Sequence, residues 1–156
     1  MNELKKIRLD NNITQVETAK LLKISRRSYQ KYESLIDEDD EKLKYYIYRL
    51  KELTNIDENH GLLTIDRIKN VVGEVMKKYD IKSCYLFGSY AKGKEKETSD
   101  VDLLIDSEIT GLDFYGLVEE LRNALHKKID LLTMKSISNN SVMLTEILKD
   151  GIKIYG

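Results

Sequence analysis

The sequence predicts an α+β protein in which an N-terminal all-α bundle precedes a small α/β domain with a mixed sheet. Up to about residue 54, apolar residues recur at the three- and four-residue spacing of amphipathic helices. After residue 61, short apolar runs of strand length alternate with longer amphipathic stretches. The polar segment TNIDENHG between them has the composition of a linker. We therefore expect domains at residues 1–54 and 62–156, with a linker at 55–61.

Composition narrows the classes of protein to which the chain can belong. Its 156 residues suffice for two small domains, and 41% hydrophobic residues can build their cores. No apolar run reaches the length of a membrane span, and the polar start MNELKKIR is not a signal peptide. Cys84 stands alone, which excludes an internal disulfide framework and fits a reducing compartment. We therefore expect a cytoplasmic protein without a membrane partner.

The N-terminal residues predict three short helices with explicit start signals. The first covers Asn2–Asp10 and ends at a pair of asparagines. Thr14 is a good N-cap for a second helix, and Glu17 three residues later completes a capping box. Ser25 is placed to cap a third helix that runs to about Ser34. Two short helices joined by a tight turn predict a helix-turn-helix.

The stretch NNITQVETAKLLKISRRSYQKYES resembles the helix-turn-helix family of phage repressor-like regulators. The resemblance implies binding to double-stranded DNA, and a net charge of +4 over residues 1–34 agrees with it. Lys23 stands in the turn where the family often has glycine. The alternative is a helical bundle used for protein contact, with its basic residues merely solvated. The side chains expected to face DNA are Gln15, Arg26, Arg27, Ser28, Gln30 and Lys31.

The rest of the chain alternates between helices and strands. An acidic run at residues 37–41 precedes an amphipathic helix, since acidic residues favour the positive end of a helix. The elements expected after the linker are a helix from Thr64, a strand at 84–87, a strand at 101–105, a helix ending at about 125, a strand at 128–132 and a helix at 140–149.

The stretch YLFGSYAKGKEKETSDVDLLID, residues 85–106, carries the strongest chemical signal. Asp100 and Asp102 are two apart at the start of a strand, so their side chains share one face, with Cα atoms about 7 Å apart. Buried carboxylates are costly unless they are paired or bind a metal, and Mg²⁺ prefers such oxygen ligands. Gly88 and Ser89 end the preceding strand, where a glycine lets backbone approach a phosphate. An ordinary turn with loop-capping aspartates is the alternative, but the ordered pattern with ten residues between Ser89 and Asp100 favours metal-assisted phosphoryl or nucleotidyl transfer.

The motif LFGSYAKG…SDVDLLID resembles the nucleotidyltransferase superfamily that includes DNA polymerase beta, and most of all its minimal nucleotidyltransferases. The resemblance implies that Asp100 and Asp102 hold two Mg²⁺ ions and that ATP is the substrate. It also implies a third carboxylate on a later strand, for which Asp130 in KKIDLLTM is the candidate. The residues expected to bind nucleotide phosphates are Gly88, Ser89 and Lys92, the last standing where the family usually has arginine.

Minimal enzymes of this family commonly act with a small helical partner, a HEPN-type toxin. The resemblance therefore implies an antitoxin that adenylylates its cognate toxin and, through the helix-turn-helix, represses its own operator. Repressor-type readers usually bind as dimers, so a homo-oligomer is compatible with it. The alternative is a DNA-binding regulator whose nucleotidyltransferase module only senses nucleotide or docks a partner. A drug-modifying enzyme is disfavoured, because no separate acceptor domain is present.

Overall fold

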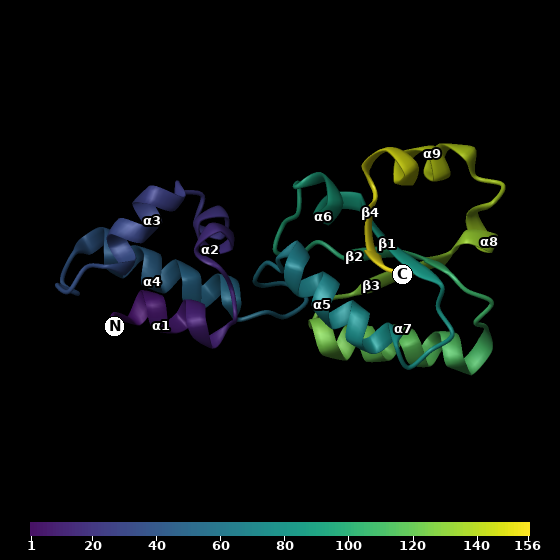
Figure 1. The fold of residues 1–156 in the computed structure, drawn as a ribbon, viewed down its shortest axis with the longest axis horizontal. Helices are drawn as coiled ribbons and strands as arrows, with labels where there is room; N and C mark the ends of the chain where they lie inside the picture. The colour runs from purple at the N-terminus through teal and green to yellow at the C-terminus, as the bar shows by residue number, and fades with distance from the viewer. The chain divides into compact units, whose positions relative to one another are not determined.

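The computed structural model describes residues 1–156 and divides into two compact units. The first contains Met1–Ile56 with His60–Leu62, and the second contains Asp57–Asn59 with Leu63–Gly156. The first is entirely helical, and the second combines helices with a sheet, as Figure 1 shows. The expected α+β class is therefore confirmed. None of the helices has the length and apolar content that a membrane span requires.

The first unit is a bundle of four helices whose start signals are those expected. Its helices are α1 Glu3–Asp10, α2 Gln15–Leu22, α3 Arg26–Glu33 and α4 Glu41–Thr54. The capping box at α2 is complete, because Thr14 Oγ1 accepts from the Glu17 amide and Glu17 Oε2 accepts from the Thr14 amide. Ser25 Oγ accepts from the Ser28 amide and so caps α3. These caps satisfy amides that a helix start leaves without partners.

One buried ion pair lies in the core of the helical unit. Two side-chain nitrogens of Arg8 donate to the Glu33 carboxylate, at 3.0 and 2.8 Å. Burial acts to raise the pKa of Glu33, but the hydrogen bonds and the charge of Arg8 oppose it, and that pKa lies below its usual value. The pair joins α1 to the end of α3 and so fixes the third helix of the bundle. The apolar core around it is formed by Leu4, Ile13, Ala19, Leu22, Tyr29, Tyr32, Leu43, Ile47, Leu50 and Leu53.

The second unit is built on a four-stranded sheet in the order β3-β2-β1-β4. Strand β1 is antiparallel to both β2 and β4, whereas β2 and β3 are parallel, so the expected mixed sheet is confirmed. Its strands are β1 Ser83–Phe87, β2 Val101–Asp106, β3 Ile129–Thr133 and β4 Ile152–Tyr155. Its helices are α5 Ile65–Met76, α6 Gly88–Lys92, α7 Gly111–Leu125, α8 Met134–Ile137 and α9 Ser141–Asp150.

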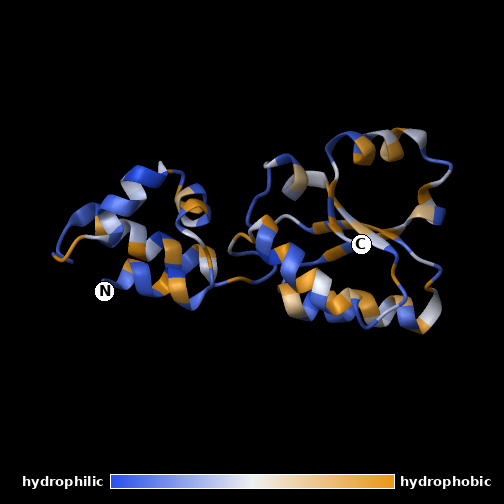
Figure 2. Cartoon of the chain, in the orientation of Figure 1, coloured by the Kyte–Doolittle hydropathy of each residue, from blue (hydrophilic) through white to orange (hydrophobic).

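Helices cover both faces of this sheet. Helices α5 and α7 lie along one face, while α8 and α9 lie over the other, as Figure 1 shows. Leu104 of β2 packs with Ile137 and Ile147 on the α8–α9 face. Because side chains alternate along a strand, Leu103 and Ile105 point to the opposite face, where they are fully buried. Two covered faces explain why β2 is an almost unbroken apolar run, orange in Figure 2.

Strand β4 corrects the sequence-based expectation, which ended the fold at the last helix. Its four residues follow Gly151 directly and add an antiparallel strand to the edge of β1. A segment this short shows no usable periodicity, so its strand character depends on the partner that β1 offers.

Candidate active site

Three aspartates gather where β2 and β3 begin. In the parallel register of these strands Asp102 lies directly opposite Asp130. Neighbouring strands are about 4.8 Å apart, and residues opposite each other share a face, so both carboxylates project together. Asp100 immediately precedes β2 and lies two residues from Asp102. The sequence predicted the shared face of Asp100 and Asp102, and the strand order adds Asp130 beside them.

Asp102 is the aspartate most affected by this arrangement. Its half-buried position and the nearby charges of Asp130 and Asp100 raise its pKa from 3.8 to about 6. A hydrogen bond with Asp130 and the charge of Glu146 act in the same direction. Like-charged carboxylates in a partly desolvated site favour protonation unless a cation joins them. The cluster therefore has the electrostatics of a cation site.

Gly88 closes one side of the cluster. In the antiparallel register Phe87 lies opposite Asp102, which brings the next residue, Gly88, against the aspartate side chain. Gly88 has φ +72°, and a Cβ built there would stand 2.1 Å from Asp102 Oδ2. Both the left-handed backbone and the absent side chain are thus required. Gly88 and Ser89 open α6, so one of the three expected phosphate-binding residues lies against the Asp102 carboxylate and the second follows it in the chain.

Lys92, the third expected phosphate-binding residue, ends α6 and is engaged within the unit. Its Nζ forms an ion pair with Glu146 of α9, and this hydrogen bond raises the Lys92 pKa. Glu146 also adds negative charge near Asp102. A phosphate that binds Lys92 must therefore compete with Glu146, an acid that no local sequence pattern identified.

A hollow of about 340 Å³ lies beside two of the aspartates. Asp100 and Asp130 line it together with two basic residues, Arg122 of α7 and Lys128. The hollow therefore combines carboxylates with cations. Gly88 and Ser89 are not among its lining residues, and Gly88 lies against Asp102 instead.

The donor set fits a divalent cation in its chemistry. The three aspartates share this end of the sheet, although no three acidic, histidine or cysteine side chains lie close enough together to form a complete metal-ligating group. The three aspartates repel one another, and a cation among them would supply the attraction that they lack. Carboxylate oxygens are the hard ligands that Mg²⁺ prefers, with nucleotide phosphates completing the shell. Asp100, Asp102 and Asp130 are therefore the residues that would hold it.

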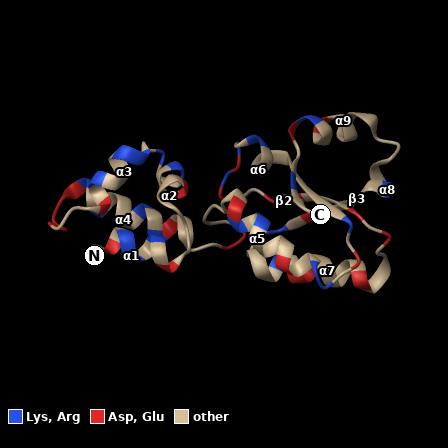
Figure 3. Ribbon diagram, in the orientation of Figure 1, with Lys and Arg blue, Asp and Glu red and all other residues tan.

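The helix-turn-helix side chains expected to face DNA lie on α2 and α3. Gln30 Nε2 donates to Gln15 Oε1 at 3.0 Å, so the two amide groups form a pair across the motif. Arg26 and Arg27 are exposed in the first turn of α3, where Figure 3 shows basic residues along the helix. Ser28 Oγ accepts from the Ser25 hydroxyl, and Lys31 lies over the Tyr32 ring. All six residues thus belong to the two helices of the motif.

The turn of this motif explains its unusual lysine. Lys23 is the C-cap of α2 with φ 58° and ψ 41°, the left-handed conformation that glycine adopts most easily. Lysine in place of glycine therefore keeps the geometry of the turn, but a residue with a side chain is less stable in the left-handed conformation.

Tyr90 is a structural residue of the site that sequence analysis missed. It is 1% exposed, and its hydroxyl lies 3.5 Å from the Leu63 amide. Burial raises the pKa of Tyr90 to about 12, so its hydroxyl stays protonated. Tyr90 anchors α6 in the unit and thereby holds Gly88 and Ser89 in place. The motif GSYAKG placed it next to the turn, but its contact with Leu63, 27 residues earlier in the chain, could not be read from the motif.

Comparisons with known proteins agree with this geometry. The pattern of the polymerase beta nucleotidyltransferases matches residues 69–156, and a helix-turn-helix pattern matches residues 4–37. A Methanocaldococcus jannaschii protein, provisionally named a protein adenylyltransferase, is 40% identical over 80 residues, 47% of this chain and 93% of that protein. The protein adenylyltransferase MntA of Thermococcus cleftensis is 33% identical over 85 residues, 51% of this chain and 86% of MntA.

A solved structure has the same fold in the corresponding region. It is a toxin-antitoxin crystal structure with AMP-PNP, to which the chain is 23% identical with a TM-score of 0.50. The match covers 56% of this chain and 73% of that one. At this identity the likeness concerns the fold alone.

Proposed function

The chain belongs to the polymerase beta nucleotidyltransferase family and carries an N-terminal helix-turn-helix, and from this premise we propose that it is a Mg²⁺-dependent protein adenylyltransferase. It transfers AMP from ATP to a protein acceptor. The observation that supports this most directly is the cluster of Asp100, Asp102 and Asp130 beside Gly88. The names of two relatives, both protein adenylyltransferases, support the acceptor class.

The proposed chemistry divides the work between the two sides of the aspartate cluster. Gly88 and Ser89 bind the β- and γ-phosphates. Lys92 leaves its ion pair with Glu146 and binds a phosphate oxygen. When bound, Mg²⁺ neutralises the triphosphate and makes the acceptor hydroxyl more acidic. Asp130 receives the acceptor proton as the acceptor oxygen bonds to the α-phosphorus. The bond from that phosphorus to the bridging oxygen breaks, and pyrophosphate leaves.

The acceptor that we propose is a cognate HEPN-type toxin, which AMP transfer inactivates. The family resemblance of the GSYAKG…SDVD motif supports this partner. The hollow beside Asp130 supports entry of the acceptor from that side, since it is separate from the phosphate-binding turn. The protein is thus the antitoxin of the pair.

The test of catalysis uses the purified chain, its partner, Mg²⁺ and ATP labelled at the α-phosphate. We expect label on the partner with the wild-type chain and a loss of at least about 100-fold with Asp102→Asn, since one carboxylate of the metal site is removed. Asp106→Asn, at the opposite end of β2, is the matched control and should transfer at the wild-type rate. If Asp102→Asn transferred label at the same rate as the Asp106→Asn control, the proposal would be wrong.

We also propose that the helix-turn-helix binds the operator of the chain's own operon. The support is the basic charge of residues 1–34 and the exposure of Arg26 and Arg27 on α3. The paired amides of Gln15 and Gln30 are suited to reading adenine, because a glutamine can bond two atoms of its edge. Antitoxin and repressor functions then reside in one chain.

The test of DNA binding is a competition gel shift with the native promoter against random DNA. Arg27→Ala and Gln30→Ala should each cost about 1–3 kcal/mol if they contact bases. Affinity should fall steeply with salt, because phosphate contacts release counterions. Lys42→Ala, an exposed change on α4, is the control. Equal binding to promoter and random DNA would contradict operator recognition.

A purely regulatory protein with a non-catalytic nucleotide-sensing module is the alternative. It predicts nucleotide binding without label transfer in the catalytic assay. The intact set of three aspartates favours the enzyme, because sensing alone does not require Asp130.

A further inference from the structure

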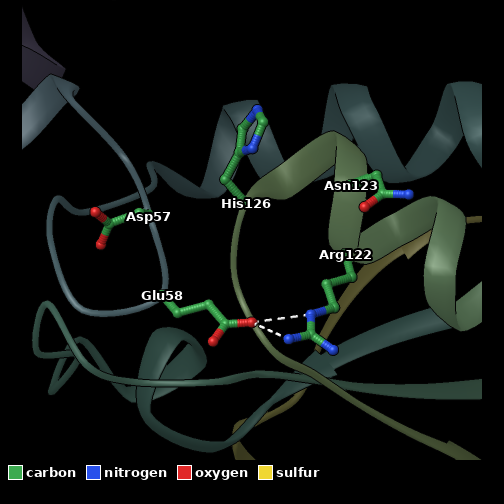
Figure 4. A pocket seen from close by; sticks show the side chains of 5 residues that line it. All are labelled: Asp57, Glu58, Arg122, Asn123 and His126. Atoms are coloured by element: carbon green, nitrogen blue, oxygen red, sulfur yellow. Dashed lines mark hydrogen bonds and ion pairs between the residues drawn. The ribbon is translucent and has the colours of Figure 1, made fainter.

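Residues Asp57–Asn59 belong to the nucleotidyltransferase unit, although the sequence predicted them as part of a linker. Glu58 Oε1 accepts hydrogen bonds from Arg122 of α7, from Nε at 2.9 Å and from a terminal guanidinium nitrogen. Figure 4 shows this ion pair at one wall of a cavity of about 220 Å³, which Asp57 and His126 also line. An ion pair this exposed contributes little stability by itself. Its effect is to fix where the segment lies.

Lys127 is a buried basic residue in the same region. Its side chain is fully buried, and its Nζ donates to the Glu97 carbonyl at 2.6 Å. Burial lowers the pKa of Lys127, while the nearby charges of Asp57 and Glu97 oppose that shift. A lysine is rarely buried unless its charge is compensated. Asp57 lines the same cavity as His126, the residue before Lys127, and its charge offsets part of the cost of burying the lysine.

Lys127 joins two segments that carry the aspartates. Glu97 lies in the connection from α6 to β2, three residues before Asp100. Lys127 lies two residues before β3, which carries Asp130. The connection contains a hydrogen-bonded turn, in which the Lys96 backbone amide donates to Ser99 Oγ at 2.8 Å and the Ser99 backbone amide donates to the Lys96 carbonyl at 2.9 Å.

The two segments are also joined through the backbone. The Val101 amide donates to the Lys128 carbonyl at 2.9 Å, immediately after Asp100. Asp100 is thus held between this bond on one side and the Lys127–Glu97 contact on the other. These two bonds fix the backbone on either side of Asp100.

We propose that Asp57 and Lys127 are positioning residues for the metal site, with Asp57 supporting the buried lysine that holds Glu97 and thereby Asp100. The inference rests on the proposed function, because it concerns the same aspartates. It means that residues ahead of the expected catalytic domain complete its metal site.

The experiment measures Mn²⁺ binding to the full-length chain by electron paramagnetic resonance, with Mn²⁺ in place of Mg²⁺. Lys127→Met keeps the apolar stem and removes the charge and the bond to Glu97. We expect it to weaken Mn²⁺ binding about 10-fold, as loss of a residue behind a metal ligand typically does. Lys127→Arg, which keeps the charge, should restore part of the affinity. Asp57→Asn should weaken binding in the same direction by a smaller factor.

Lys69→Met, an exposed change on α5, is the matched control for the lysine substitution. Wild-type Mn²⁺ affinity in folded Lys127→Met and Asp57→Asn would overturn the proposal. If Lys127→Met does not fold, Asp57→Asn decides the outcome, because its side chain lies at the surface. Binding is read without transfer, so a chain that binds Mn²⁺ but does not transfer AMP contradicts the proposed function and leaves this inference standing.

Discussion

At the residue scale, the central feature of the nucleotidyltransferase unit is a carboxylate held where its charge is unfavourable. Asp102 is half-buried beside Asp130 and Asp100, and the backbone of Gly88 lies against it. Without a cation, the ionised form of Asp102 opposes folding. In the metal site that we propose, the same side chain would be a ligand, and the bound cation would offset this cost.

A pH experiment tests this trade. The pKa of Asp102 is raised to about 6 in the folded chain, so the folded state binds its proton more tightly than the unfolded state. Stability of the metal-free unit should therefore fall as pH rises from about 4 to about 7. Thermal unfolding in EDTA across this range measures it. Asp102→Asn should flatten the profile and abolish stabilisation by Mg²⁺, whereas Asp106→Asn should leave both unchanged. If Asp102→Asn showed the wild-type dependence of stability on pH, Asp102 would not be the group that causes it.

At the element scale, strand order brings the site together. Strands β2 and β3 are neighbours and parallel, which places Asp130 opposite Asp102. Helices α6 and α9 meet through Lys92 and Glu146, so the proposed phosphate ligand and its competitor come from different parts of the chain. In the helical unit, the turn between α2 and α3 depends on one residue, Lys23, in a left-handed conformation.

Lys23→Gly should stabilise the helical unit, because glycine adopts the left-handed conformation without the steric cost of a side chain. We expect a gain of about 0.5–1 kcal/mol in the free energy of unfolding. Hydrogen exchange of amides in α2 and α3 measures it. Lys20→Gly is the control, since the same change inside α2 should destabilise by about 1 kcal/mol. Destabilisation by Lys23→Gly would mean that the lysine side chain contributes contacts that outweigh the backbone cost.

At the scale of the whole molecule, the two functions that we propose belong to two units with separate cores. The helical unit has its own apolar core around Leu4, Tyr29 and Leu50. The sheet unit buries both faces of its strands under its own helices. The predicted boundaries at residues 54 and 62 stay a prediction, and they matter because Asp57–Asn59 associate with the sheet unit.

Two fragments test the boundary. A chain of residues 57–156 contains Asp57 and Glu58, whereas a chain of residues 63–156 lacks them. We expect both to fold by circular dichroism, since the sheet and its covering helices are present in each. The longer fragment should bind Mn²⁺ as the full chain does, and the shorter one about 10-fold more weakly. Equal affinity would place the functional boundary after the linker at residues 55–61, as the sequence alone predicted.

The sequence by itself determined the features that depend on near neighbours. Helix starts at Thr14 and Ser25 were predictable because a cap bonds an amide three residues away. The shared face of Asp100 and Asp102 followed from the period of a strand. In each of these cases, the interacting groups lie within a few residues of one another.

The tertiary structure alone decided the features that depend on distant pairing. The register that sets Asp130 opposite Asp102, the ion pair of Lys92 with Glu146 and the strand Ile152–Tyr155 each need a partner far along the chain. The burial of Lys127 near Asp57 is of the same kind. Local residue patterns carry no information about which strands become neighbours, because that choice is made by packing the whole core.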